Sequence, residues 1–314
     1  MVLPDFSNIK KAHKLISAQI HRTPVLTSKS INAIIGGELY FKCENFQKVG
    51  AFKFRGASNA VLSLPNELAS KGIATHSSGN HAAALALAAR MRGISAYVVM
   101  PKNAPEIKVR AVEGYGATIT FCEPTLAARE LTLAKVIAET GATEIHPYNN
   151  FQVIAGQGTA AKELLEDYPQ INQLLCPVGG GGLLSGTALA VKALSPGASV
   201  IACEPAGADD AYRSFYGDRI FPSENPCTIA DGLLTSLGTM NYAIIRNNVD
   251  AVVTVSEESI VKAMRTIWER MKIIIEPSAA VPFAAILERK IDVSGKKTGI
   301  IFSGGNVDLN KLPF

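Results

Sequence analysis

Lys53 is the residue of this chain best suited to chemistry, because it stands between Phe52 and Phe54 in a run of small and apolar residues, 49–56. Burial among apolar groups disfavours a charged ammonium and lowers the pKa of a lysine. A neutral amine is both a base and a nucleophile toward an aldehyde. A lysine on an apolar surface can also extend its charged end into water. The segment therefore predicts a reactive amine where other segments supply partners for it.

A second segment predicts an anion site. Four consecutive glycines, Gly179, Gly180, Gly181 and Gly182, follow the apolar run 174–178 and precede a stretch with helical spacing. Glycine lets backbone N–H groups approach an anion closely, and a helix N-terminus adds a favourable dipole. The turn is neither a dinucleotide fingerprint nor a Walker loop, since no Gly-Lys-Ser/Thr follows. It predicts a phosphate cradle in preference to a plain tight turn.

Two further turns carry hydroxyl and amide side chains. Ser303 and the two glycines after it end an apolar segment, 298–302. Residues 75–81, Thr-His-Ser-Ser-Gly-Asn-His, join a predicted strand to a predicted helix. The free N–H groups at such a helix start would hold a carboxylate well. Serine and asparagine are also favoured helix caps, and the two roles can coexist.

The elements that must position these turns repeat along the chain. Short apolar runs alternate with helical patterns, which is typical of strand–helix–strand units around parallel sheets. We predict an α/β fold with two open sheets flanked by helices. A large cofactor-binding domain would comprise 1–62 and 150–314, with a small mobile domain, 72–147, inserted in it. Strands are expected at 73–76, 95–100, 117–121, 173–178, 199–203, 252–255 and 298–302, and helices at 7–20, 79–92, 104–115, 126–140, 155–165, 183–194 and 256–271.

Composition limits the function classes. With 314 residues, 47% hydrophobic, the chain can bury a large core. No apolar run approaches the roughly 20 residues of a membrane span, and the start lacks a signal pattern, so we expect a cytoplasmic protein with no membrane contact. The net charge of +4 forms no basic block, which argues against nucleic acid. The five scattered cysteines fit reduced thiols in a core.

In their order and spacing, the four segments resemble the pyridoxal-phosphate enzymes of the tryptophan synthase β-like fold (fold type II), specifically the serine racemase and serine/threonine dehydratase branch. The resemblance covers essentially the whole chain and implies a homodimer. It implies that Lys53 forms the Schiff base with the cofactor aldehyde and that the four-glycine turn holds the phosphate. Phe52 would lie against the pyridine ring, Asn80 would hydrogen-bond the ring hydroxyl, and Ser303 would meet the pyridine nitrogen.

A fifth segment, 204–210, is similar to the divalent-cation site of serine racemases. That similarity implies that Glu204, the Ala208 carbonyl and Asp210 bind a structural Mg²⁺ or Ca²⁺. Hard cations take carboxylate, carbonyl and water oxygens, so the ligand set is chemically sensible. A solvated acidic helix start is the alternative. ATP is a candidate activator.

By the resemblance, the reaction is α,β-elimination from L-serine or L-threonine, giving a 2-oxo acid and ammonia, together with serine racemisation. By the resemblance to the racemases, Ser78 would act on the substrate face opposite Lys53, whereas many threonine dehydratases carry alanine there. The substrate turn would comprise Ser77, Ser78, Gly79, Asn80 and His81. A hydroxyl at the pyridine nitrogen suits elimination and racemisation better than transamination.

Several alternatives remain open. The segment 49–56 is also similar to hydroxyaspartate dehydratases, whose substrate carries a second carboxylate. Arg129 matches a position near the substrate in both groups, or it is a plain surface arginine. His81 would bind the substrate carboxylate or serve as a core or capping residue. A β-replacement synthase is the weaker enzyme alternative, since its asparagine-rich turn is absent, and intact Lys53 argues against a silent ligand-binding protein.

Overall fold

The residues described by the computed structural model, 1–77, 79–104 and 106–314 without the side chain of Ile107, form two sheets, which confirms the predicted fold class. The strands are β1 (Val25–Leu26), β2 (Glu38–Cys43), β3 (Ile73–His76), β4 (Ala96–Pro101), β5 (Thr118–Cys122), β6 (Thr143–Glu144), β7 (Gln173–Pro177), β8 (Ser199–Pro205), β9 (Ala251–Val255) and β10 (Lys297–Phe302). The larger sheet has the order β1-β2-β10-β7-β8-β9 and is parallel except for β1. The smaller sheet, β5-β4-β3-β6, is parallel throughout.

Helices cover both faces of the larger sheet. The helices are α1 (Phe6–Ile16), α2 (Lys29–Ile35), α3 (Lys53–Leu62), α4 (Asn66–Ala69), α5 (Asn80–Arg92), α6 (Glu106–Gly114), α7 (Leu126–Thr140), α8 (Phe151–Asp167), α9 (Gly182–Leu194), α10 (Asp210–Tyr216), α11 (Thr239–Asn248), α12 (Glu257–Met271) and α13 (Pro277–Leu287). Leu175 and Ile300 lie in the core cluster that contains α13, whereas Leu174 and Ile301 lie in the one that contains α9. Successive strand residues point to opposite faces, so α13 and α9 lie on opposite sides of the sheet.

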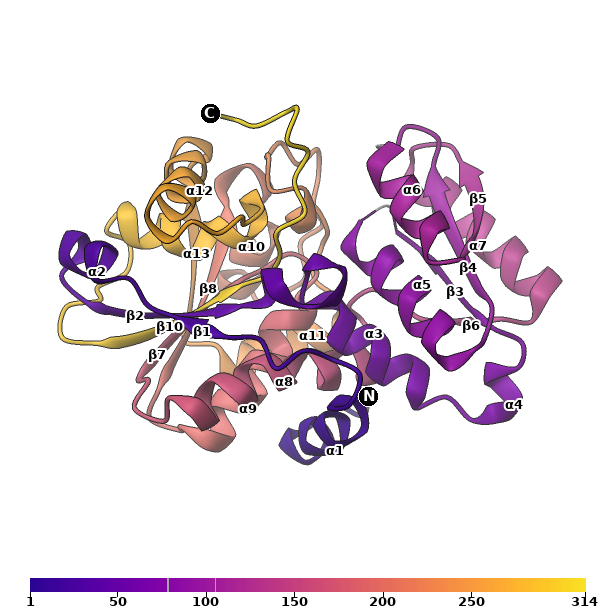
Figure 1. The fold of residues 1–314 in the computed structure, drawn as a ribbon, viewed down its shortest axis with the longest axis horizontal. Helices are drawn as coiled ribbons and strands as arrows, with labels where there is room; N and C mark the ends of the chain where they lie inside the picture. The colour runs from indigo at the N-terminus through magenta and orange to yellow at the C-terminus, as the bar shows by residue number, and fades with distance from the viewer. Residues whose placement is uncertain (78, 105) are drawn as a thin grey trace.

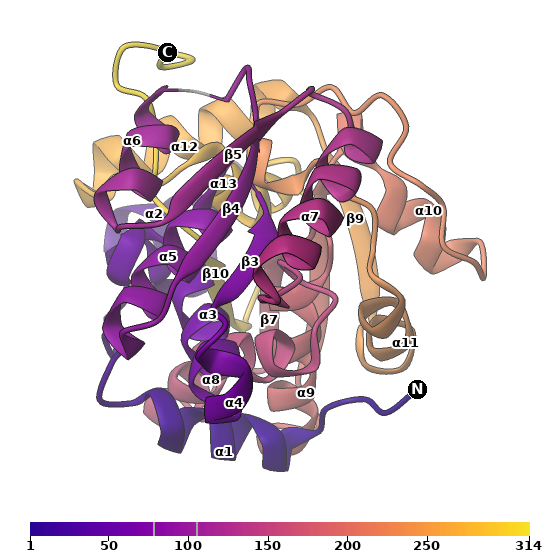
Figure 2. The same ribbon diagram turned by 90° about the vertical axis from the view of Figure 1, so that its right-hand side faces the viewer.

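The smaller sheet forms its own lobe with α5, α6 and α7, at the right of Figure 1. Val98 packs in a cluster with α5 and α6, and its neighbour Val99 packs in a cluster with α7. Figure 2 shows α5 and α7 on the two sides of β3 and β4. All four strands lie within 72–147. The domain boundaries and the mobility of this lobe remain predictions.

Glycines let α3, α8 and α9 approach one another closely. A Cβ on Gly156 of α8 would stand 2.7 Å from the Cα of Gly56 on α3. A Cβ on Gly186 of α9 would stand 2.4 Å from the backbone nitrogen of Gly158 on α8. Neither position has room for a side chain, so the three helix backbones are in direct contact. Helix α3, which begins at Lys53, is therefore pressed against α8.

Some sequence expectations were wrong in detail. The helix expected at 7–20 ends at Ile16, and the one expected at 155–165 spans Phe151–Asp167. The Asn150 side chain caps the latter by accepting N–H bonds from Gln152 and Val153, a start signal that the apolar pattern did not include.

Helix α13 was not expected at all. It is buried on nearly every side, so its sequence lacks the alternation of apolar and polar residues that indicates a helix with one exposed face. Its interior Pro282 also argues against a helix on sequence grounds. Of the five cysteines, Cys227 is exposed rather than in the core, while the others are buried. None of the helices that the structure describes is long and apolar enough to cross a membrane.

Candidate active site

Lys53 lies at the carboxyl end of β10, far from it in sequence. The N–H of Phe52 donates to the carbonyl of Ser303 at 2.9 Å, and Ala51 forms an isolated bridge with Gly304. Parallel strands bring their carboxyl ends to one edge of a sheet, where ligands bind in open α/β folds. The lysine and serine segments, both singled out in the sequence, are therefore joined directly by backbone contacts.

The amine of Lys53 is in a poorly solvated place. Its Nζ donates to the carbonyl of Pro147 at 3.1 Å and lies 5.1 Å from the centroid of the Phe52 ring. Burial lowers the pKa of Lys53 to about 8, although the charge of Glu276 acts in the opposite direction. About half of the amines would be neutral at pH 8, against less than about 1% for an ordinary lysine. The side chain is thus suited to act as a nucleophile or a base.

The four-glycine turn connects β7 to α9 under the ring of Tyr148. A Cβ on Gly180 would stand 2.4 Å from that ring, and one on Gly179 would stand 2.9 Å from the Cα of Leu233. Gly181 is the N-cap of α9, has a φ of 91°, and provides no side-chain cap. The packing therefore requires glycine and leaves the first N–H groups of α9 without side-chain acceptors, which suits an anion such as a phosphate.

Asn241 holds this turn in place. Its Nδ2 donates to the carbonyl of Gly180 at 2.8 Å and to the carbonyl of Tyr148 at 3.1 Å. Sequence analysis missed both Asn241 and Tyr148, since neither stands in a glycine-rich segment or beside a predicted site residue. Only the tertiary structure brings them together.

Glu276 is the central residue that the sequence analysis missed. Its carboxylate accepts two bonds from the Nδ2 of Asn80, at 3.0 and 3.1 Å, and one from the N–H of Asn306 at 3.2 Å. Asn306 in turn donates to the Oδ1 of Asn80 at 2.9 Å. These bonds connect the first residue of α5 to the turn after Ser303. Burial raises the pKa of Glu276 to about 7.

The substrate turn precedes α5, and its Ser78 lies outside the described residues. The Ser77 hydroxyl accepts from the N–H of Gly79 at 3.3 Å, and Gly79, the N-cap of α5, provides no side-chain cap. His81 is 2% exposed, and its Nε2 lies 3.2 Å from the carbonyl of Ile145. Burial lowers the pKa of His81 to about 3. A neutral, enclosed imidazole favours the core reading of His81 over carboxylate binding.

Arg129 lies near a row of imidazoles. Burial, followed by the charge of Arg129, lowers the pKa of His76. The His76 ring centroid is 6.3 Å from that of His146, which is 4.5 Å from that of Tyr148. The Nε of Arg129 is buried and has no hydrogen-bond partner among the described residues. The arginine is thus more enclosed than a plain surface residue, and it carries an unused donor.

The predicted cation ligands Glu204 and Asp210 are both fully buried. Glu204 accepts from the N–H groups of Ala211 and Tyr212, at 2.9 and 2.8 Å. Burial, with the charge of Asp210, raises the pKa of Glu204 to about 9. Burial also raises the pKa of Asp210 to about 6, and neither of its carboxylate oxygens has a hydrogen-bond partner in the described part of the chain. Two neighbouring buried carboxylates that form no ion pair with any residue the structure describes fit a bound cation.

Comparisons with known proteins identify the family of the chain. Residues 16–304 match the model of the family described as "Pyridoxal-phosphate dependent enzyme". The chain is 52% identical to the serine racemase of Dictyostelium discoideum, over 99% of this chain and 98% of that protein. A crystal structure of serine racemase from that organism has a TM-score of 0.93 at 53% identity, covering 97% of this chain and 99% of its own.

Two further relatives carry other activities in their names. The chain is 50% identical to the beta-hydroxyaspartate dehydratase of Paracoccus denitrificans over the whole of both chains. A crystal structure of a threonine deaminase from T.th. has a TM-score of 0.93 at 42% identity, covering 98% of this chain and 99% of its own.

The chain therefore belongs to the pyridoxal-phosphate-dependent enzymes. The predicted similarity to the serine racemase and dehydratase branch is confirmed, as is the type II, tryptophan synthase β-like fold. The site fits the cofactor of this family, because the uncapped start of α9 suits a phosphate and the poorly solvated Lys53 amine suits an aldehyde.

We predict that Glu276→Gln changes how stability depends on pH. The pKa of about 7 lies above the usual value for glutamate, so the folded protein binds an extra proton between pH 5 and pH 7. The wild type should therefore lose about 2 kcal/mol of stability between pH 5 and pH 8, a loss that glutamine does not share. Urea unfolding of both proteins, freed of cofactor, measures this. A difference in stability that is the same at both pH values would contradict the raised pKa.

Proposed function

We propose that this chain uses pyridoxal phosphate to eliminate water from L-serine or L-threonine, and that it also racemises serine. Hydrolysis of the dehydrated product takes up one water and releases ammonia, so that the net products are a 2-oxo acid and ammonia. The observation that carries the proposal is the Lys53 amine, with its lowered pKa, joined by backbone bonds to the Ser303 turn. The full-length similarity to serine racemase and threonine deaminase supports the choice of reaction.

The residues of the site have separate tasks in this proposal. Pyridoxal phosphate, when bound, makes the α-hydrogen of an amino acid acidic by delocalising the negative charge left behind. Lys53 takes that hydrogen as a proton at its Nζ, for which a pKa near 8 is favourable. The turn 179–182 holds the phosphate, Phe52 and Ser303 hold the ring, and Asn80 orients the ring hydroxyl. The N–H groups at the start of α5, to which the N-cap Gly79 offers no side-chain acceptor, would bind the substrate carboxylate.

A threo-3-hydroxyaspartate dehydratase, which forms oxaloacetate, is the second candidate. The observation in its favour is Arg129, whose buried Nε lacks a partner among the residues described. A guanidinium suits a second substrate carboxylate. The relative from Paracoccus denitrificans supports this candidate. A β-replacement synthase remains the weaker alternative.

The cation site, the activator, the oligomeric state and the location are supported by fewer observations than the reaction. We propose that Glu204, Ala208 and Asp210 hold a structural Mg²⁺ or Ca²⁺, supported by the two buried carboxylates. Activation by ATP and a homodimer are expectations from the family resemblance, and a cytoplasmic location is expected from the sequence pattern alone.

Product analysis tests the proposed reaction. Purified protein given L-serine, L-threonine or L-threo-3-hydroxyaspartate should form pyruvate, 2-oxobutyrate or oxaloacetate, and the fastest substrate identifies the reaction. We predict that Lys53→Ala stays folded but loses the visible absorbance of bound cofactor and at least about 10²-fold in every product rate, since a proton-transfer group contributes about 10²–10⁴-fold. Turnover of the variant at the wild-type rate would refute the role of Lys53.

We predict that Ser78→Ala separates the two activities. Racemisation needs a proton group on the face opposite Lys53, whereas elimination from an L-substrate needs only the lysine. D-serine formation should fall at least roughly a hundredfold more than pyruvate formation, both measured from L-serine in one preparation. A parallel fall in both products would point to a dedicated dehydratase. If Ser78 only caps the helix, its replacement by alanine would lower stability by about 1 kcal/mol and leave the ratio of D-serine to pyruvate formation unchanged.

We predict that chelation lowers the melting temperature and that Mg²⁺ restores it, because an ion that binds only the folded state adds about 2.7 kcal/mol at a hundred times its Kd. Asp210→Ala should abolish the response to Mg²⁺. Asp209→Ala is the matched control, since Asp209 pairs with Arg213 instead and should leave the response intact. If the melting temperature of the wild type is the same with chelator as with Mg²⁺, no such ion is bound.

A further inference from the structure

A fully buried ion cluster lies directly behind the reactive lysine. Arg55, in the first turn of α3, is 0% exposed. Its Nε and one terminal nitrogen donate to the carboxylate of Glu44, at 2.7 and 2.9 Å. Its two terminal nitrogens donate to the carboxylate of Glu163, both at 2.8 Å. Both carboxylates are therefore bound in the two-pronged manner that only a planar guanidinium permits.

Further contacts complete the cluster. The buried amine of Lys42 donates to Glu163 at 2.7 Å, and the Thr23 hydroxyl donates to Glu44 at 2.6 Å. Burial alone would raise the pKa of Glu163, but hydrogen bonds and charge from Arg55 and Lys42 lower it to about 2. Two cations thus balance two carboxylates. The formal charges of the cluster therefore sum to zero.

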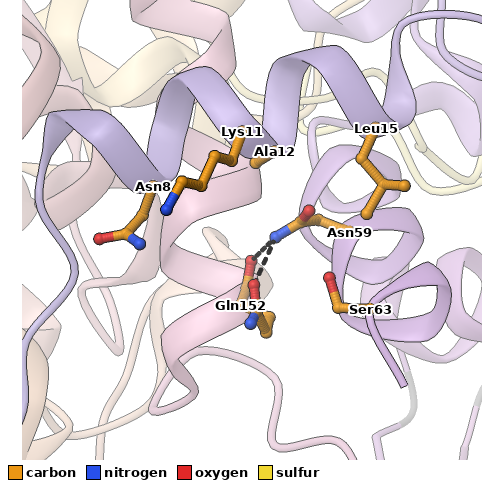
Figure 3. A pocket seen from close by; sticks show the side chains of 7 residues that line it. All are labelled: Asn8, Lys11, Ala12, Leu15, Asn59, Ser63 and Gln152. Atoms are coloured by element: carbon orange, nitrogen blue, oxygen red, sulfur yellow. Dashed lines mark hydrogen bonds between the residues drawn. The ribbon is translucent and has the colours of Figure 1, made fainter. Parts of the chain in front are cut away.

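The cluster joins three elements at the start of α3. Glu44 follows the carboxyl end of β2, Glu163 lies on α8, and Arg55 lies two residues after Lys53. The N-cap of α3, Phe52, makes no side-chain cap bond. Two further contacts tie α3 to α8: the N–H of Gly56 donates to the side-chain oxygen of Gln157 at 3.1 Å, and one turn after Arg55 the Nδ2 of Asn59 donates to the backbone and side chain of Gln152 at 2.7 and 3.1 Å (Figure 3). The first turn is thus held from the side by Arg55.

We propose that Arg55 is a positioning residue for Lys53, because its paired contacts with Glu44 and Glu163 set the depth at which the first turn of α3 presents the lysine. The inference rests on the proposed role of Lys53. Around the amine lie Glu276 at the start of α13, His81 on α5 and His146 before α8, and each interacts with its charge. A small outward movement of α3 would expose the amine to water and raise its pKa toward that of an ordinary lysine.

The test compares Arg55→Lys with the wild type. Lysine keeps the positive charge but cannot bind two carboxylates in the same way. Cofactor-free protein is labelled with trace acetic anhydride across pH 6–11, and acetylation of Lys53 is followed by mass spectrometry. The wild-type midpoint should lie near 8. A midpoint of about 9 in the variant would lower the neutral fraction at pH 8 about fivefold. In the cofactor-loaded variant, the visible circular dichroism band should change in intensity.

Controls separate positioning from stability. Asn59→Ala loosens the same pair of helices one turn away, so it should lower the melting temperature without moving the midpoint of Lys53. Glu44→Gln, which keeps the shape of the cluster, replaces Arg55→Lys if that variant does not fold, and should move the midpoint in the same direction by less. An unchanged midpoint and dichroism band in the folded variant would overturn the inference. The labelling measures the amine itself, so this failure is distinct from failure of the product assay.

Discussion

Desolvation of one amine is the constraint on which the rest of the site depends. Lys53 has to be uncharged for an appreciable part of the time, and only burial at the junction of several elements achieves that. The surrounding contacts serve this requirement. The Pro147 carbonyl gives the amine a hydrogen-bond acceptor, the Phe52 ring lies beside it, and the backbone bond from Phe52 to Ser303 fixes this segment at the end of β10. The carboxylate whose charge acts on this amine, Glu276, is itself kept partly protonated by burial, so it stabilises the ammonium only weakly.

Buried charges in this molecule fall into two kinds. The cluster around Arg55 is internally neutral, and each of its carboxylates is bound by several donors. Such a cluster is rigid, because moving any one member leaves a buried charge uncompensated. The pair Glu204 and Asp210 is different, since neither carboxylate forms an ion pair among the described residues and burial raises the pKa of both. The first kind suits a scaffold, whereas the second suits a site that takes up a cation.

Glycine serves two purposes in the four-glycine turn. The ring of Tyr148 and the backbone at Leu233 leave no space for a Cβ at Gly180 or Gly179, so the turn would need glycine even without a ligand. The same close packing leaves the N–H groups at the start of α9 free to bind an anion. Packing and binding are thus compatible explanations of one motif, and Asn241 supports both by fixing the Gly180 carbonyl.

The sequence by itself determined the fold class, most strands, the family and the principal motifs, because these depend on local spacing: apolar runs, glycine turns and a lysine between phenylalanines. It did not identify Glu276, Tyr148 or Asn241, and it did not show that Arg55 anchors the lysine helix. Those roles arise from contacts between segments far apart in the chain, such as Asn80 with Glu276 and Arg55 with Glu163. Only the tertiary structure decided them, because the burial that changes a pKa or fixes a guanidinium is set by which distant residues exclude water from it.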